Sequence, residues 1–469
     1  MAAGIALFTL AEPRFQILAA ALLLMSVMLF AGPRVSRWWT AAPPLTRTAV
    51  GLEPETSPSR HTLPVLAALT AAAAALRLPG LDGDLWLDEI GTVVVYLRLP
   101  PLETLQTYVS ANQHLLYSLA GSISFQLFGE SAMAARLPAA ILGIAGIPAL
   151  YFLGRLIAPR REAWLAAALL TVSYHHVWFS QSARGYTGMI LFTTLGTAFF
   201  LRAIIQDRAR DYLMWVASMV AAILFMQNAT FVLVAQVAAH ALIALREQLP
   251  ARRLFQVAWW ASIAVLVAVA AHSLVIPQMI AFMRTVDRTG LGWSLDGIIP
   301  VLTSGLIAGV GVAGLVTILA LALAGFISYW KRSPIFALIA LFAPLANLAV
   351  LAITRYGAYP RFFLYVLPFA LLIAVRGAFV IGEWLAAGLS LRRRWLPAFA
   401  ILALLFISSI VSLVPNYIYP KQDYRGALAW VESTKGTGDM VAAAGLAATA
   451  YQVYHAPSLP VLYELTDLE

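Results

Sequence analysis

The chain has 469 residues, of which 61% are hydrophobic and 11% are charged, and its formal net charge is +9. Soluble globular proteins carry about 45–50% apolar and about 25% charged residues, so the composition excludes that class and indicates an integral membrane protein. Cysteine is absent, which excludes disulfide bonds, thiol catalysis and a cysteine-based zinc site.

Long apolar segments follow one another along most of the chain. A membrane-spanning helix needs about 20 mostly apolar residues, and helices satisfy their backbone hydrogen bonds within one segment. We therefore predict an all-α polytopic membrane protein. The predicted spans, roughly twelve, are 15–31, 62–79, 136–154, 163–179, 187–205, 212–226, 229–245, 256–276, 303–327, 334–353, 362–382 and 396–415. The segment 114–128 is apolar but short, and we interpret it as an interfacial helix.

Clusters of arginine and lysine occur in every second gap between these spans. The clusters are Arg34/Arg37/Arg47/Arg60, Arg155/Arg160/Arg161, Arg202/Arg208/Arg210, Arg246/Arg252/Arg253, Lys331/Arg332 and Arg392/Arg393/Arg394. Positive charge in short loops marks the cytoplasm, so one orientation satisfies every cluster if 114–128 does not cross. The other face, the periplasmic face of a bacterial inner (plasma) membrane, then holds 80–135, 180–186, 277–302, 354–361 and the chain after 416. This spread of charge predicts no nucleic-acid partner.

The predicted spans divide the chain into three units. Residues 1–61 form an extra N-terminal transmembrane helix and a basic cytoplasmic loop, and residues 62–415 form the main transmembrane module, with the external loop 80–135. Residues 416–469 contain more charged and turn-forming residues, a helical apolar pattern at Ala427, Leu428 and Val431, and a short strand pattern in VAAAGL. We expect this last unit to be a small periplasmic α/β segment that depends on the membrane module for stability.

Two adjacent acids stand in the stretch LWLDEIG of the first external loop. Asp88 and Glu89 follow a Gly/Pro/Asp-rich turn soon after a span, on a face with few other carboxylates. A carboxylate at this edge is partly desolvated, which can raise its basicity, so both are candidate catalytic residues for proton removal. The alternative interpretation is that acids at a helix exit simply meet water and cap the next helix.

Several arginines stand on the same face, where positive charge is normally scarce. Arg184, Arg355 and Arg361 lie in polar-aromatic patches, and Arg136 lies near the outer end of its span. Guanidinium groups bind phosphate through a planar bidentate fork. Arginines at span ends can instead reach toward lipid headgroups. Acids on one loop and arginines on others favour a phosphorylated amphiphile as substrate and a proton to be removed.

Two further patches add polar candidates. The stretch ANQHLLYSL contains Asn112 and His114, which either cap the interfacial helix or bind a polar substrate, and FSQSARGY adds Tyr186 as a substrate-binding candidate. His175 and His176 lack a third metal ligand at helical spacing. We therefore predict no metal site and no required cofactor, with a divalent metal ion left as an alternative.

The series LWLDE, NQHLLYSLAGSISFQLFGESAMAARLPAAILGIAGIPALYFLGRLI, SYHHVWFSQSARGY and YPRFFLYVLPFALLIA resembles the bacterial branch of the dolichyl-phosphate-mannose protein mannosyltransferase family. This family includes the lipid A aminoarabinose transferases, and the resemblance covers about residues 62–430. It implies a GT-C helical bundle in which residues 62–415 are the catalytic module.

The resemblance also implies an activity. The expected protein is an inverting membrane glycosyltransferase, moving a hexosyl or pentosyl group from a polyprenyl-phosphate carrier such as undecaprenyl phosphate. Its acceptor is a hydroxyl of a lipid, polysaccharide or protein in the cell envelope, at the periplasmic face. Asp88 matches the family's general base, and we expect Glu89 beside it to position the acceptor or tune the basicity of Asp88. His114, Arg136 and Arg361 match other functional positions of the family.

Two positions depart from the family pattern. Many relatives carry Glu or Asp in a YSQEAR-like stretch, where this chain has Ser182, and their His-Pro-Pro reads His114-Leu115-Leu116 here. Loss of the second-loop acid weakens a metal proposal and leaves Asp88 and Glu89 as the main acidic site.

Two other function classes remain open. A secondary transporter or flippase of lipid-linked substrates is the first, although transporters usually place ionisable residues near the bilayer midplane, and this chain keeps its charges at the edges. The second is an inactive relative that binds carrier lipid as an assembly partner.

Overall fold

The computed structural model describes residues 12–40, 42–53, 59–285 and 295–462, and over 295–313 it describes the helix without its side chains. In the first half the helices are α2 (Pro13–Thr40), α3 (Arg47–Val50), α4 (Thr62–Arg77), α5 (Leu87–Thr92), η1 (Val93–Leu97), α6 (Pro101–Thr104), α7 (Leu115–Phe128), α8 (Ala132–Ile157), α9 (Arg160–Val172), α10 (Tyr174–Ser180), α11 (Tyr186–Gln206) and α12 (Ala209–Phe225).

The second half continues the helical pattern and adds two short strands. The elements are η2 (Gln227–Ala229), α13 (Thr230–Arg246), α14 (Ala251–His272), α15 (Ile276–Thr285), α16 (Leu295–Arg332), α17 (Pro334–Thr354), η3 (Pro360–Val366), α18 (Leu367–Gly388), α19 (Leu396–Ile418), α20 (Tyr424–Thr434), β1 (Ala443–Ala444), α21 (Leu446–Ala450), η4 (Tyr451–His455) and β2 (Val461–Leu462).

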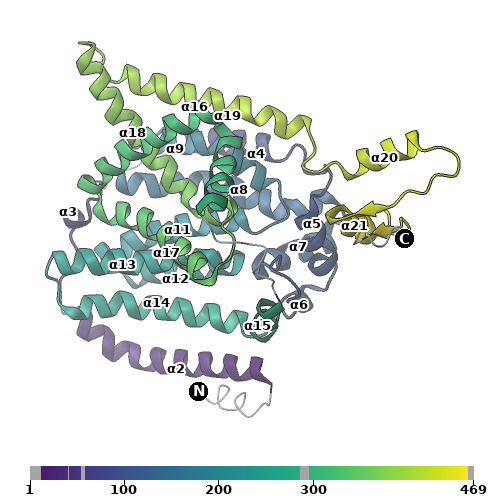
Figure 1. Cartoon of the computed structure of the whole chain (residues 1–469). Helices are drawn as coiled ribbons and strands as arrows, with labels where there is room; N and C mark the ends of the chain where they lie inside the picture. Colours follow the sequence, from purple (N-terminus) through teal and green to yellow (C-terminus); the bar gives the residue numbers. More distant parts are fainter. Residues whose placement is uncertain (1–11, 41, 54–58, 286–294, 463–469) are drawn as a thin grey trace.

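The long helices run side by side in one bundle (Figure 1). Helix α11 packs between α8 and α12, α13 packs on α17, and α16 packs on α18. Helix α2 packs on α14 at the edge of the bundle, and only 11% of the residues in its most apolar 18-residue stretch are buried. The extra N-terminal helix is therefore a peripheral addition, and residues 1–11 lie outside the described part.

In the described part of the chain, nine helices are long and apolar enough to cross a membrane. They include α2, α8, α11, α14, α17 and α19 over most or all of their lengths. Three predicted spans have other forms. The segment 62–79 is the 16-residue α4, 163–179 breaks at Ser173 into α9 and α10, and 212–226 is the 17-residue α12. The polytopic all-α fold is confirmed, and the number of about twelve spans stays a prediction.

The two ends of the bundle differ in character. At the end near α3, the loops with the predicted basic clusters meet, since Glu53 N–H donates to Leu156 O and Arg253 contacts Pro43 O and Asp207. At the other end lie α5, α6, α7 and α15 (Figure 1). Helix α7 lies beside α6 at that end, as expected of an interfacial helix.

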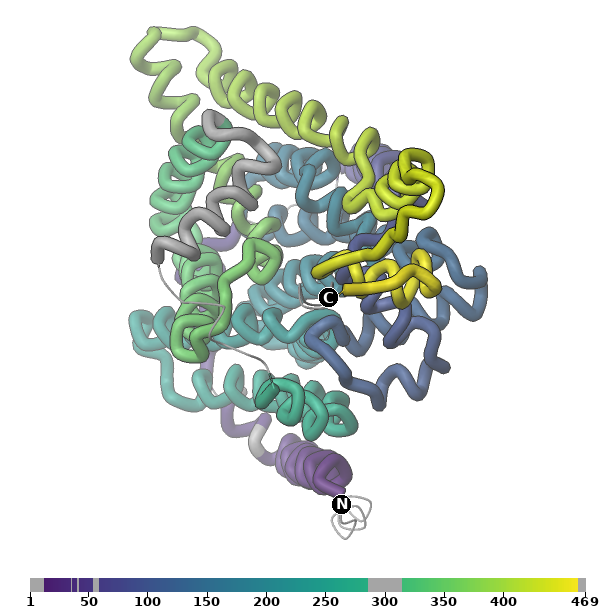
Figure 2. The backbone as a smooth tube through the Cα atoms, turned by 45° about the vertical axis from the view of Figure 1, so that its right-hand side comes forward, coloured from purple at the N-terminus to yellow at the C-terminus, as the bar shows by residue number. Residues whose placement is uncertain are grey.

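The C-terminal segment extends from the same end as α5. The predicted apolar pattern forms α20, whose first turn is capped by Asp423, the acceptor for Gly426 N–H at 2.8 Å. Strands β1 and β2 pair in parallel, Ala443 opposite Val461 and Ala444 opposite Leu462. Figure 2 shows this segment, in yellow, lying over the first outer loop, in blue. The small α/β character predicted from composition is confirmed.

Candidate active site

Asp88 lies on the short helix α5 and faces two arginines from distant parts of the chain. Its Oδ2 is 3.8 Å from Nη1 of Arg184, in the turn before α11, and 3.7 Å from Nη1 of Arg361, in η3. The Asp88 side chain is 23% exposed, whereas that of Arg184 is 5% exposed. The structure thus brings together three predicted site residues from three loops, with the carboxylate open to solvent.

Glu89 points away from this site and is fully buried. Its Oε1 and Oε2 accept from Nε and Nη2 of Arg136 at 2.8 Å and 2.5 Å, and they also accept from Ala183 N–H and Trp86 N–H. Burial alone would raise the pKa of Glu89, but Arg136, Lys421 and the Ala183 N–H bring that pKa below its ordinary value. Every oxygen of Glu89 is therefore occupied by protein donors.

Arg136 completes this buried pair from the first turns of α8. Its remaining N–H groups donate to the backbone carbonyls of Leu81, Gly83 and Asp84, at 2.8–3.0 Å. The guanidinium group therefore ties the turn before α5 to the bundle, and all five of its N–H groups are used by these contacts. Glu89 closes the first turn of α5 as well, because its acceptance from Trp86 N–H is the returning half of a capping box.

A polar wall stands beside Asp88. Asn112 Oδ1 accepts from Arg184 Nη1, and the ring of His114 lies 6.2 Å from that of Tyr186, centroid to centroid. His114, not Asn112, is the N-cap residue of α7. Nε2 of His114 is buried and has no hydrogen-bond partner within the described structure. Burial lowers the pKa of His114 well below its usual range, and Arg184 and Arg361 lower it further, so the imidazole is neutral at pH 7.

A close backbone contact explains one of the two glycines next to this wall. A Cβ at Gly185 would stand 2.1 Å from the carbonyl oxygen of Phe225, so only glycine lets the turn carrying Arg184 pack against the end of α12. At Gly91, on α5, a Cβ would stand 2.9 Å from Nδ2 of Asn112, the end of a side chain that could move aside. Of these two positions, Gly185 is therefore the one where the backbone itself requires glycine.

Arg355 is placed elsewhere. It is exposed at the end of α17, in the left-handed region with φ of 52°, and no ion pair joins it to Asp88 in the described structure. The predicted set therefore separates into three parts. One group faces Asp88, namely Asn112, His114, Arg184, Tyr186 and Arg361; the buried pair Glu89–Arg136 supports it; and Arg355 lies outside.

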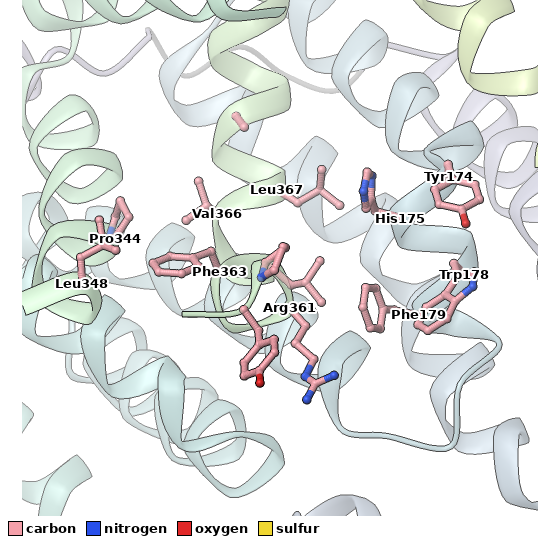
Figure 3. A pocket seen from close by; sticks show the side chains of 14 residues that line it. Tyr174, His175, Trp178, Phe179, Pro344, Leu348, Arg361, Phe363, Val366 and Leu367 are labelled. Atoms are coloured by element: carbon pink, nitrogen blue, oxygen red, sulfur yellow. The ribbon is translucent and has the colours of Figure 1, made fainter. Parts of the chain in front are cut away.

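A mostly apolar cavity of about 540 Å³ opens next to Arg361. Figure 3 shows Trp178 and Phe179 of α10 on one side and Pro344 and Leu348 of α17 on the other, with Arg361 at the edge. Val366, the last residue of η3, and Leu367, the first residue of α18, form the third wall. The lining is mostly apolar, so the cavity places the Arg361 side chain beside an apolar space.

Sequence reasoning missed the contribution of the chain after α19. Lys421 Nζ donates to Gln181 O and Ser182 Oγ, both at 2.6 Å, and Gln422 Oε1 accepts from Leu87 N–H at 2.7 Å. The available signal was a lysine directly after the last span, on the face where positive charge is scarce. In the ranges that the structure describes, no three His, Asp or Glu side chains are grouped so as to hold a metal ion.

Known proteins share this architecture. Residues 114–277 match the family model described as dolichyl-phosphate-mannose-protein mannosyltransferase, and no curated protein sequence matches the chain significantly. The solved structure of apo ArnT from Cupriavidus metallidurans is 14% identical, with 86% of both chains covered and a TM-score of 0.54. ArnT bound to undecaprenyl phosphate is 12% identical, with 86% of this chain and 90% of that chain covered and a TM-score of 0.53.

A third similar structure is the arabinosyltransferase EmbB from Mycobacterium smegmatis, 13% identical, with 86% of this chain and 45% of that chain covered and a TM-score of 0.51. The protein is thus a multi-pass membrane protein with the GT-C fold of membrane glycosyltransferases. The match over 114–277 confirms the resemblance to the dolichyl-phosphate-mannose protein mannosyltransferases that the sequence predicted.

Proposed function

We propose that this protein is an inverting glycosyltransferase that moves a sugar from a polyprenyl-phosphate carrier to an acceptor hydroxyl at the outer face of the membrane. The observation that carries the proposal is the position of Asp88, faced by two arginines at the mouth of an apolar cavity. A carboxylate, a pair of cations able to bind phosphate and an adjoining apolar cavity are the parts that such a transfer needs.

The donor enters as an amphiphile. Its polyprenyl tail lies in the apolar cavity between α10, α17 and α18, and its phosphate meets Arg361 at the edge. Arg184, which faces the same Asp88 oxygen as Arg361, provides a second guanidinium group for the phosphate oxygens. The ArnT structure bound to undecaprenyl phosphate supports a carrier of this class.

The chemistry is one inverting displacement. The acceptor oxygen attacks the anomeric carbon, the bond from that carbon to the phosphate oxygen breaks, and the acceptor proton moves to Asp88. Polyprenyl phosphate leaves as an anion, so it needs charge stabilisation from Arg184 and Arg361 more than it needs a proton. The base and the phosphate must lie on opposite sides of the sugar ring.

The ion pairs of Asp88 suggest how the site changes when the donor binds. Both N–O distances, 3.7 Å and 3.8 Å, exceed the about 2.7–2.9 Å of a direct charge-assisted hydrogen bond. A phosphate group attracts the same two guanidinium groups with more charge and better geometry. We infer that donor binding draws both arginines off Asp88 and leaves its carboxylate free for the acceptor proton.

The polar wall orients the sugar. Neutral His114 offers Nε2, and Asn112 and Tyr186 lie next to Arg184, within the reach of sugar hydroxyls on the donor. Glu89 and Arg136 act indirectly, by holding α5 and its Asp88 in place. This assigns Glu89 a positioning role and makes Asp88 the only catalytic base.

The proposal includes a location, the periplasmic face of a bacterial inner membrane. Since the chain has no cysteine, single cysteines can report the side of each loop. Thr437→Cys, in the exposed segment after α20, should react with a membrane-impermeant maleimide on intact cells, and Ser390→Cys, in the exposed turn after α18, should react only after lysis. Labelling of both cysteines on the same side would refute this topology.

The activity itself is tested with mass spectrometry of glycolipids from cells with the protein, without it, and with Asp88→Asn. We expect one envelope glycan to lose a sugar in the deletion and in Asp88→Asn cells, while the sugar-loaded carrier accumulates. Full glycan modification by Asp88→Asn would remove the base assignment. A glycolipid unchanged in structure but shifted between leaflets would favour a lipid transporter instead.

A further inference from the structure

The segment that follows the last span, residues 416–425, crosses the outer end of the bundle and is called the C-terminal strap below. At its centre, Lys421 Nζ donates to Trp178 O at 3.0 Å, Gln181 O at 2.6 Å and Ser182 Oγ at 2.6 Å. The ammonium group also lies 4.2 Å from the centroid of the Trp178 ring. An ammonium group has three donors, and here each of them meets an oxygen.

All of these acceptors belong to residues 178–182, which lead directly into the catalytic face. The next residue, Ala183, donates its N–H to Glu89 Oε1 at 2.6 Å, and Arg184 then faces Asp88. Along the chain, Ser182, which binds Lys421, is therefore one residue from Ala183, which binds Glu89, and two residues from Arg184, which faces Asp88. A displacement of 178–182 would move Arg184 relative to Asp88.

The strap holds the other side of the site too. Gln422 Oε1 accepts from Leu87 N–H at 2.7 Å, and Leu87 is the first residue of α5. Arg425 Nε lies 3.0 Å from Asp84 Oδ1 in the turn before α5. One continuous strap thus contacts both the loop that carries Asp88 and the loop that carries Arg184.

The cation at Lys421 stands among neutral acceptors. The acceptor at position 182 is a serine hydroxyl, and the two other acceptors are backbone carbonyls. Burial lowers the pKa of Lys421 to about 7, with Glu89 opposing this shift and Arg136 adding to it. Burying an ammonium group without a directly paired carboxylate costs folding free energy. This cost suggests that the contacts of Lys421 serve more than stability.

We propose that Lys421 is a positioning residue for sugar transfer, whose ammonium group fixes residues 178–184 and thereby sets Arg184 against Asp88. The inference rests on the proposed function, and it adds a requirement from the C-terminal strap. Lys421 touches neither donor nor acceptor, so its loss lowers the rate of transfer more than the affinity for the donor.

The test uses the full-length protein reconstituted with detergent-solubilised total cell envelope of the deletion strain, which supplies the accumulated donor and the unmodified lipid, glycan or protein acceptor. Lys421→Ala removes three methylene groups and the ammonium group, the atoms of n-propylammonium. We expect kcat to fall about tenfold or more, as for lost orientation, with the donor KM within about threefold. Added n-propylammonium should restore part of kcat in a saturable manner, and 1-propanol should not.

Matched variants separate a positioning role from a structural one. Lys435→Ala removes an exposed lysine that lies after the strap and pairs with Glu432, and this variant should keep the wild-type kcat. Lys421→Met keeps the length of the side chain without its charge. Wild-type kcat in Lys421→Met or Lys421→Ala would overturn the proposal, and so would a loss that n-propylammonium does not relieve in the folded variant.

If Lys421→Ala and Lys421→Met do not fold, Ser182→Ala decides, because it removes one acceptor and leaves the lysine in place. We expect kcat to fall about threefold or more with Ser182→Ala, the effect of one lost hydrogen bond, and an unchanged kcat would overturn the inference. Absence of transfer by the wild-type protein would contradict the proposed function instead, so the two failures are distinguishable.

Discussion

Glu89→Gln tests whether the second acid of the pair supports the fold or acts in the chemistry. Glu89 and Arg136 are both essentially buried, with 0% and 2% of their side chains exposed, and Glu89 accepts four hydrogen bonds. Glutamine keeps the shape, but its single acceptor oxygen cannot replace these contacts, and the Arg136 charge stays buried. Breaking such a pair costs about 3–5 kcal/mol. At about 2 °C per kcal/mol for a long chain, the apparent Tm should fall by roughly 6–10 °C.

The assay is thermal unfolding of the purified protein in detergent, followed by the fluorescence of its 13 tryptophans. Glu130→Gln is the matched control, because Glu130 pairs with Arg98 at 2.8 Å with side chains 42% and 41% exposed. Such surface pairs contribute about 0–1 kcal/mol, so the Tm should change by no more than about 2 °C. If Glu89→Gln unfolds like Glu130→Gln and loses only turnover, Glu89 acts in the chemistry and the positioning argument is wrong.

Three further predictions follow from the site. Arg361→Ala should slow transfer by about 100-fold or more, since it removes a donor aimed at developing charge, and wild-type turnover of labelled donor would remove its phosphate role. Leu348→Trp should fill the apolar cavity and raise the donor KM. Ile353→Trp changes a residue of the same helix that is 82% exposed, and it should leave the donor KM unchanged; equal KM values for the two variants would contradict binding of the polyprenyl tail in this cavity. In a pH series, wild-type kcat should fall as pH rises through about 7, because the pKa of Lys421 is lowered to that value and its ammonium loses its proton, with Glu89 and Arg136 the charged groups that face it. Lys421→Arg, which stays charged, should lack that fall, and an identical fall in both would refute its origin in Lys421.

The sequence predicted the parts of the structure that depend on local pattern. Apolar length and basic loops predicted the helical bundle, the short α7 at its end, and Asp88 and Arg184 on the same face. The resemblance named Asp88 as the base, but the sequence did not predict that Glu89 forms a buried ion pair with Arg136, 47 positions later in the chain. Adjacent residues on a helix point in different directions, so the two acids meet different partners.

The other differences have long-range causes. In the sequence, Arg136 and Arg361 are both arginines on the predicted outer face. In the structure, Arg136 forms a buried ion pair with Glu89, whereas Arg361 lies at the edge of the cavity. Lys421 joined no predicted group because its partners are some 240 residues earlier in the chain. Contacts between residues so far apart in the chain depend on how the helices pack, and no periodic pattern in one sequence predicts that packing.

The C-terminal strap also has a consequence for biosynthesis. Leu87 and Gln422 are separated by 335 positions, so at about 5–20 residues per second the ribosome needs roughly 20–70 s to make the strap after α5 has been made. The Glu89–Arg136 pair, only 47 positions apart, can form early and hold α5 during this interval. If Lys421 sets Arg184 against Asp88 as proposed, a nascent chain that stops before the strap keeps the Glu89–Arg136 pair but lacks that alignment. The proposed sugar transfer would then begin only after the last span and the strap have been made.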